Sequence, residues 1–412
     1  MIDAYAALKQ ANFRYFVSAH FLFTVALLTQ EIALSFYLYK LTHNPLSLGL
    51  IGLAEAVPFI LLALFGGYLA DKIERRKLYL SSFFVVCLIS LGLAFYLTNH
   101  TPSVSSDPWV IYSCVFGLGI ARGFYNPAWS SLKPYLVASK DYSNSASWSA
   151  QFWQLGRILG PVLGGFLFAW IGLSATLYVA FAMFVLTFII ASLIPAIASE
   201  KTESLPIIQS IKEGIAFVRK THIVFYSLLL DMLSVLFGGV IAILPAFAED
   251  ILHVGSEGLG VLRAAPAIGA VLTMLLTAYF PPTKKAWQNM LIAVLGFGIA
   301  TFVFALSKDF YLSIIALFFT GVFDSISVVV RSTIMQIIPP THMRGRISSV
   351  NSIFVSTSNE LGAFESGLAA SLMGTVPSVL MGAGVTLIVV LITYVNTKEL
   401  FGIDLTKLKK AE

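Results

Sequence analysis

The sequence predicts an all-α polytopic membrane protein whose chain crosses the bilayer twelve times as two pseudo-symmetric six-helix bundles. Composition is the first reason, since 58% of the 412 residues are hydrophobic and only 11% are charged, whereas soluble domains carry about 25% charged residues. The second is that apolar runs of roughly 20 residues, enough to span a membrane, recur along the chain. Lipid leaves no backbone polar group unpaired, which favours helices. The third is an internal repeat.

Apolar runs and the polar breaks between them place the twelve spans. Their predicted ranges are 13–40, 46–71, 77–98, 108–133, 145–170, 173–196, 222–247, 256–281, 287–306, 309–338, 347–372 and 376–397. The one long loop contains "PIIQSIKEGIAFVRK", whose apolar spacing is that of an amphipathic helix. Such a helix either lies on the membrane face or is a plain linker. The predicted domains are bundle 1–196, cytoplasmic linker 197–221 and bundle 222–412.

The repeat relates the two predicted bundles. "GLAEAVP" (Gly52–Pro58) aligns with "GVLRAAP" (Gly260–Pro266) at an offset of 208, and Pro134 recurs as Pro340 at an offset of 206. In carriers built from repeats, the substrate site lies near the bilayer midplane between halves that rock about it. The repeat therefore predicts a carrier architecture.

The distribution of basic residues predicts the orientation. Twenty of the 26 Lys and Arg residues lie in segments on the side of the N-terminus, and two, Lys40 and Lys308, lie on the other. The positive-inside rule then places both termini in the cytoplasm. The same bias accounts for the net charge of +5 without nucleic acid as a partner. Short loops without a large appended domain favour a bacterial inner membrane.

The stretch "GGYLADKIERRK" follows the second span. It resembles the signature G-x-L-a-D-R/K-x-G-R-R/K of the major facilitator superfamily, with Gly67, Asp71, Arg75 and Arg76 at four of its positions. Glu74 replaces a glycine there, which is similar to the branch of the enterobactin exporter and its drug-efflux relatives. The resemblance implies a conformational gate on the cytoplasmic side. In it Gly67 admits a neighbouring backbone closely, Asp71 accepts from a helix N-terminus, and the arginines bind acids or lipid phosphates. Anchoring of the chain at the membrane surface is the competing explanation. It accounts for Arg75 and Arg76 but not for Gly67 and Asp71 at this spacing.

A second stretch, "GRILGPVLGG", lies in the fifth span. It resembles the exporter element G-x-x-x-G-P-x-x-G-G of the same superfamily, and its defining residues are Gly156, Gly160, Pro161, Gly164 and Gly165. Glycines every four residues make a smooth helix face for close packing, and the proline permits a kink. Ordinary helix packing is the other explanation. Together with the first stretch, the element favours efflux over uptake.

Charged side chains inside the spans are costly and usually functional. When residues at the span ends are left aside, ten lie within the predicted boundaries: Glu31, Glu55, Arg122, Arg157, Asp231, Arg263, Asp324, Arg331, Glu360 and Glu365. For each, a structural pair between helices is the competing explanation. Arg331 is near the cytoplasmic end and is expected to snorkel. All except Arg331 and Glu365 are candidates for the substrate or proton pathway.

Arg122 is the candidate with a family parallel. The resemblance puts it in the place of the arginine linked to proton coupling in drug antiporters, although here a glycine follows it at once. An arginine in that place would keep a nearby carboxylate ionised until substrate displaces it, and Glu31 and Glu55 are the nearest candidates. Glu55 aligns with Arg263 across the repeat, so we expect these two to face one another.

These observations predict a secondary active transporter, a proton-coupled exporter (antiporter) of a small organic molecule such as a drug-like amphiphile or siderophore, working by alternating access. An uptake carrier or uniporter of the same fold is the alternative. No HExxH, GxSxG or GxxxxGK pattern occurs, so we expect no zinc, serine or ATP chemistry and no enzyme activity. The expected partners are the substrate, protons and lipid. We expect a monomer without metal or cofactor, driven by the proton gradient.

Overall fold

The computed structural model describes residues 5–138, 141–196, 207–340 and 343–405, and these residues form helices and loops without any strand. Its long helices are α1 (Ala11–Thr42), α2 (Pro45–Lys72), α3 (Arg75–Asn99), α4 (Asp107–Ser130), α5 (Tyr142–Ser192), α6 (Ile207–Lys220), α7 (His222–Gly238), α9 (Gly255–Tyr279), α10 (Ala286–Leu306), α11 (Phe310–Ile337), α12 (Arg344–Met373) and α13 (Thr375–Asn396). The short ones are η1 (Ala7–Lys9), η2 (Lys133–Tyr135), η4 (Ile241–Ile243), α8 (Leu244–Ala246), η5 (Phe247–Ile251) and η7 (Lys398–Leu400).

Helices stand where the sequence predicts spans. Nine helices in the described part of the chain are long and apolar enough to cross a membrane. One of them, α5, holds two predicted spans, because Gly172 breaks it with a φ of +76° that only glycine adopts readily. Helices α4 and α12, of 24 and 30 residues, are more polar and supply the remaining two. The all-α membrane fold is confirmed, and twelve helical spans agree with it.

The seventh span differs from the prediction. A continuous helix was expected over 222–247, but α7 ends at Gly238, and a 3-10 turn, a short helix and a π-helix follow. Gly238 packs so closely that a Cβ would lie 2.8 Å from the Phe297 ring. Ser366 then donates its hydroxyl hydrogen to the Gly239 carbonyl at 2.9 Å. The glycine pair therefore ends the helix, and a side chain of α12 satisfies the freed carbonyl.

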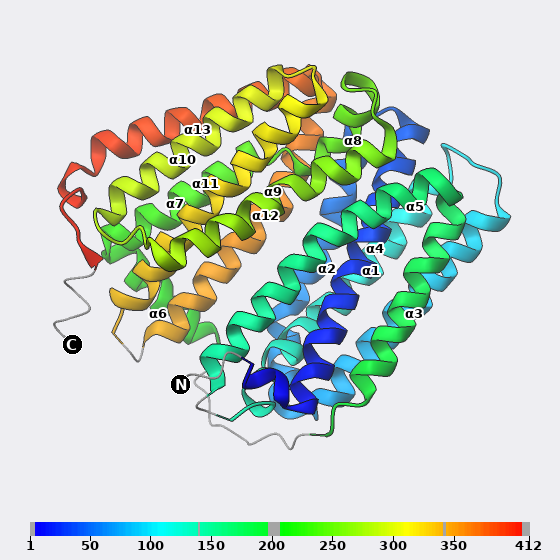
Figure 1. The fold of residues 1–412 in the computed structure, drawn as a ribbon, viewed down its shortest axis with the longest axis horizontal. Coiled ribbons are helices and arrows are strands. Elements are labelled where there is room, and N and C mark those ends of the chain that lie inside the picture. The colour runs from blue at the N-terminus through cyan, green and yellow to red at the C-terminus, as the bar shows by residue number, and fades with distance from the viewer. Residues whose placement is uncertain (1–4, 139–140, 197–206, 341–342, 406–412) are drawn as a thin grey trace. The chain divides into compact units, whose positions relative to one another are not determined.

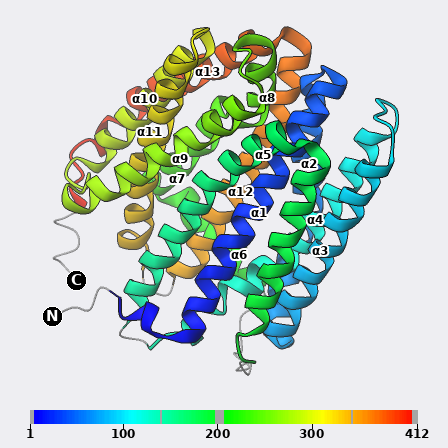
Figure 2. The ribbon, with the colours of Figure 1, turned by 45° about the vertical axis from the view of Figure 1, so that its right-hand side comes forward.

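The chain divides into two compact units. Unit 1 comprises Met1–Glu203 and His253–Ala264, and unit 2 comprises Ser204–Leu252 and Ala265–Glu412. In unit 1, α1 lies along α5, α2 lies along α4, and α3 packs on α4 and α5 (Figure 1). In unit 2, α10 lies between α11 and α13, and α7 packs on α12 and α13 (Figure 2). The first part of α9 thus belongs to unit 1 and the rest to unit 2.

Each unit has its own packed interior. In unit 1, Phe16 stacks on Trp129 with ring centroids 4.4 Å apart, and Phe23 stacks on Phe83 at 4.8 Å. In unit 2, fully buried Trp287 donates its ring N–H to the Thr397 hydroxyl at 2.8 Å. Lipid is as apolar as these side chains, so van der Waals packing and such hydrogen bonds hold the helices together.

The predicted amphipathic helix of the linker is α6. Its apolar side packs on α12, where a Cβ at Gly214 would lie 2.8 Å from Val350, and Val218 is buried in the core of unit 2. Glu213 forms an ion pair with Arg346 of α12. These contacts make α6 part of unit 2. Residues 197–206 of the predicted linker lie outside the described part of the chain.

Candidate functional site

The first charged pair of the site joins α2 and α4. The backbones of the two helices touch, because a Cβ at Gly119 would lie 2.4 Å from the Glu55 carbonyl oxygen and 2.8 Å from the Pro58 ring. This approach brings Arg122 Nη1 to 2.7 Å from Glu55 Oε1. The guanidinium also covers the Phe59 ring, 4.4 Å from its centroid. The Arg122 and Glu55 side chains remain 28% and 25% exposed, so the pair is accessible.

A second pair joins α1 to the first part of α9 within unit 1. Arg263 Nη2 lies 2.5 Å from Glu31 Oε1. The expectation that Arg263 faces Glu55 is therefore wrong. Glu55 instead forms an ion pair with Arg122 of α4. Arg263 forms its ion pair with Glu31 of α1. Of the two carboxylates proposed to serve Arg122, Glu55 is confirmed as its neighbour and Glu31 has a different one.

The glycine element of α5 packs as its spacing predicts. A Cβ at Gly156, Gly160 or Gly164 would come within 2.9 Å of atoms of α1, so these three glycines form one contact face. Thr29 of α1 reinforces it by donating to the Gly160 carbonyl at 3.1 Å. Gly165 lies on a different face, where a Cβ would come within 2.2 Å of a carbonyl oxygen of α9. Helix α5 therefore packs closely against α1 on one face and against the first part of α9 on another.

The two glycines of the gate stretch differ in their contacts within unit 1. A Cβ at Gly67 would meet no atom within 4 Å in the described part of the chain, and the close approach expected there between the two halves stays a prediction. Its neighbour Gly66 packs against α4, since a Cβ would lie 2.0 Å from the Gly123 carbonyl oxygen. Successive residues point about 100° apart around a helix, so only one of the two glycines faces α4.

The basic residues of the gate make local contacts at the start of α3. Arg76 donates from Nη2 to the Ser192 carbonyl at 2.6 Å, which caps the end of α5. Buried Arg75 lies over the Tyr135 ring, 4.7 Å from its centroid. Glu74, the residue that departs from the signature, pairs with Lys77 at 3.3 Å. The side chain of Asp71, the last residue but one of α2, lies outside the described part of the structure.

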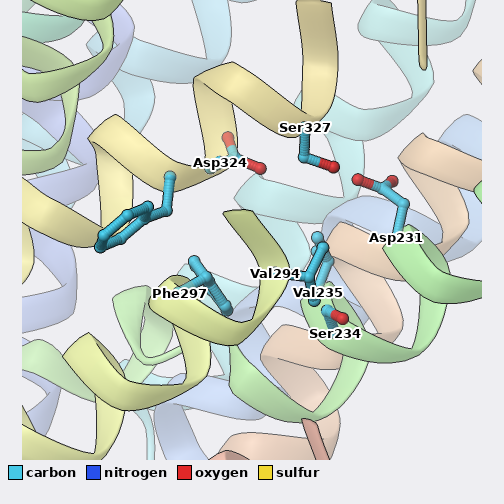
Figure 3. A pocket seen from close by; sticks show the side chains of 8 residues that line it. Asp231, Ser234, Val235, Val294, Phe297, Asp324 and Ser327 are labelled. Atoms are coloured by element: carbon cyan, nitrogen blue, oxygen red, sulfur yellow. The ribbon is translucent and has the colours of Figure 1, made fainter. Parts of the chain in front are cut away.

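Two aspartates of unit 2 line a small cavity. Asp231 of α7 forms an ion pair with Arg331 of α11, and each side chain is only 7% exposed. The expectation that Arg331 snorkels is wrong, because its guanidinium turns inward to a buried carboxylate. Asp324, two helical turns before Arg331, lines the same cavity as Asp231 (Figure 3).

The remaining candidates lie elsewhere. Arg157 of α5 lies over the Trp153 ring, 4.9 Å from its centroid. Glu360 and Glu365 are half-buried on α12. Neither glutamate lines the cavity of unit 2.

Sequence reasoning missed Asp107, a buried carboxylate at the start of α4. It is 1% exposed and accepts hydrogen bonds from the Tyr37 hydroxyl at 2.6 Å, the Tyr96 hydroxyl at 3.3 Å and the Ser103 backbone N–H at 3.2 Å. The predicted span began one residue later, so Asp107 was counted with the loops. The available signal was an aspartate directly before a proline, which is typical of a helix start.

Comparison with known proteins identifies the family of the chain. The model of the family described as "Transmembrane secretion effector" matches residues 2–406. Among curated proteins, the enterobactin exporter EntS of Citrobacter koseri is 25% identical over 371 residues, covering 89% of this chain and 87% of the relative. The enterobactin exporter EntS of an Escherichia coli O81 strain is 25% identical over 389 residues, covering 93% and 91%.

Solved structures share the fold at low identity. A mutant of the nucleoside transporter NupG matches with a TM-score of 0.78 and 13% identity, over 94% of this chain and all of the other. An inward-facing, unoccupied bacterial homologue of the human lysosomal transporter Spinster matches with a TM-score of 0.68 and 16% identity, over 97% and 98%. The protein is a multi-pass membrane transporter, and its chain belongs to the transmembrane secretion effector family of the major facilitator superfamily.

Proposed function

We propose that this protein is a proton-coupled exporter of a small organic molecule of the siderophore or drug-like class, working by alternating access. The observation that carries the proposal is the accessible Glu55–Arg122 pair inside two predicted spans, in a chain related to enterobactin exporters over 93% of its length. We place the protein in a bacterial inner membrane with both termini in the cytoplasm. It acts as a monomer, without cofactor, metal or nucleic acid.

The pair suits exchange between a proton and a cargo. While Glu55 is ionised, it holds Arg122 by a charge-assisted hydrogen bond at 2.7 Å. Ionised Glu55 can also accept a hydrogen bond from a hydroxyl or amine group of a cargo. A proton on Glu55 competes with that group, so a proton that binds from the outer side releases the cargo there. Loss of the proton on the cytoplasmic side restores the carboxylate for the next cargo, and the same group therefore binds proton and cargo in turn. Because Glu55 is about a quarter exposed, a proton or a cargo atom reaches it without unfolding either helix.

The charged pair of α1 and α9 and the glycine face of α5 support the same cycle. Arg263 and Glu31 add a second polar contact in unit 1, and the α1–α5 face keeps the helix pair rigid while the halves of the chain move. The gate residues Asp71, Arg75 and Arg76 hold the cytoplasmic ends closed in one state of the cycle.

The decisive experiment uses energised inverted membrane vesicles that carry the protein. Their lumen is acidified by respiration, and we expect added enterobactin, or another siderophore, to enter and to release protons measured by a pH-sensitive dye. Vesicles carrying Glu55→Gln are the control and are expected to show no substrate-dependent proton release. Cargo movement that is indifferent to ΔpH would contradict antiport. Accumulation of the cargo by intact cells would indicate uptake instead of export.

A further inference from the structure

The linker helix α6 packs on unit 2 with one side and leaves the opposite side exposed. A Cβ at Gly214 would lie 2.8 Å from Val350 of α12, and Val218, one turn later, is buried in the core of unit 2. At 3.6 residues per turn, the exposed positions lie on the other side of the helix. We call them the basic face of α6, and they are Lys212, Ile215, Ala216, Arg219 and Lys220.

The charges of the basic face are all positive. They come from Lys212, Arg219 and Lys220, which are each exposed. Glu213 is the one acidic residue of α6, and it forms an ion pair with Arg346 of α12. The basic face therefore complements a negatively charged partner.

The end of α6 lies beside a membrane span. Only Thr221 separates Lys220 from α7, and the segment His222–Ile251 is long and apolar enough to cross a membrane. Phe225, one turn into α7, is 37% exposed, and an aromatic ring of this kind is typical of the boundary between membrane and water. Arg219 and Lys220 thus lie at the level of the lipid headgroups.

The apolar part of the basic face favours a lipid surface over a free anion. Ile215 is 37% exposed and lies between Lys212 and Arg219 along the helix. At a membrane surface, long basic side chains reach the phosphates while apolar atoms between them enter the boundary with the acyl chains. A free anion in water offers no such contact to the isoleucine.

We propose that the basic face of α6 binds the phosphate groups of anionic lipids in the cytoplasmic leaflet. Its three cations contact the headgroups, and the packing of α6 on α12 fixes the helix at that depth. Each Lys or Arg near an anionic membrane surface strengthens the attraction by about fivefold, and salt screens it within a Debye length of about 8 Å at physiological ionic strength.

This surface is separate from the proposed export site. It lies in unit 2, includes neither Glu55 nor Arg122, and rests only on the predicted cytoplasmic position of the linker. A failure of proton-coupled export would therefore leave it standing, and its own failure would leave export untouched.

The test places a reporter on the basic face of the full-length protein. Ala216→Cys, in a chain that also carries Cys87→Ala and Cys114→Ala, is labelled with an environment-sensitive dye and reconstituted in lipid nanodiscs. We expect the emission to shift to shorter wavelength when phosphatidylglycerol replaces part of the phosphatidylcholine. A nitroxide on the lipid headgroup should then quench the dye. High salt should reverse both effects, because it shortens the Debye length to about 3 Å at 1 M.

Removal of the charges is expected to remove the response. Arg219→Gln with Lys220→Gln should lower the apparent affinity for phosphatidylglycerol by at least about tenfold, and the further change Lys212→Gln should abolish the shift. Lys40→Gln with Lys308→Gln is the matched control, because it also removes two exposed positive charges but on the opposite side of the membrane in the predicted orientation. This control should respond as the unsubstituted chain does, and size-exclusion profiles verify that each variant is folded.

Three results would overturn the proposal. The first is the same emission in phosphatidylglycerol and phosphatidylcholine nanodiscs, and the second is a full response in the triple glutamine variant. The third is a shift caused by inorganic phosphate in phosphatidylcholine nanodiscs at equal ionic strength, since the face would then bind a free anion and not a lipid surface.

Discussion

The two units each contain a carboxylate–guanidinium pair, but the pairs differ in their access to solvent. In unit 1, Glu55 and Arg122 are 25% and 28% exposed, whereas in unit 2, Asp231 and Arg331 are each 7% exposed. A buried pair that loses one member leaves an uncompensated charge away from water, so it resists rearrangement. An accessible pair exchanges partners at much lower cost. The difference separates a pair suited to coupling from a pair suited to holding helices together.

The same contrast extends to the scaffold that carries the charges. In unit 1, Gly119 of α4 meets Pro58 of α2, and Arg122 follows three residues after that glycine. In unit 2, Gly321 of α11 meets Pro266 of α9, with a Cβ only 1.9 Å from its carbonyl oxygen. Asp324 follows three residues after Gly321. The glycine–proline contact is thus repeated, while the charge beside it is reversed.

The largest effect is expected from breaking the buried pair. Asp231→Ala leaves the Arg331 guanidinium uncompensated, and we expect a loss of about 3–5 kcal/mol in the free energy of unfolding. Chemical denaturation in mild detergent measures it. Glu55→Ala, at the accessible pair, is the matched comparison and should cost less than about 1 kcal/mol.

A double variant makes this comparison sharper. Asp231→Leu combined with Arg331→Met replaces the pair by apolar side chains and is expected to recover most of the lost stability, as in other buried pairs. If Asp231→Ala and Glu55→Ala cost the same, burial does not distinguish the two pairs.

A smaller effect on stability and a large one on transport are expected from reversing the accessible pair. Glu55→Arg with Arg122→Glu keeps the ion pair but moves the carboxylate from α2 to α4. We expect folded protein in near-normal amounts and cargo transport reduced at least about tenfold, because the proton-binding group then sits on the wrong helix. Each single variant serves as a control and should lower the folded yield, since like charges then lie together. Normal transport by the double variant would show that the pair is only structural.

Much of the fold was predictable because helices in lipid must satisfy their own backbone groups. Long apolar runs therefore mark spans, and Gly172 marks the turn within α5. The end of α7 at Gly238 was not predictable, because it depends on the distant ring of Phe297 and the hydroxyl of Ser366.

The candidate site was predictable in its residues but less so in its pairs. Charges inside apolar runs stand out at once, yet the partner of Arg263 depends on how helices pack. Alignment of the repeat pointed to Glu55, whereas the packed helices bring Glu31 within 2.5 Å. Gly66 and Gly67 show the same limit, because only the orientation of α2 decides which glycine faces α4.

The last comparison concerns two aspartates at the starts of corresponding helices, Asp107 of α4 and Asp309 of α11. Asp107 is 1% exposed and accepts a hydrogen bond from the Tyr37 hydroxyl at 2.6 Å. The carboxylate of exposed Asp309 accepts the Leu312 backbone N–H at 2.8 Å as a helix cap. We expect Asp107→Ala to cost about 2–3 kcal/mol in unfolding free energy, since it leaves buried donors without an acceptor. Asp309→Ala should cost about 1 kcal/mol, the usual value of a helix cap. Equal shifts in melting temperature would show that burial adds nothing to Asp107, and the contrast between the units would then be confined to their ion pairs.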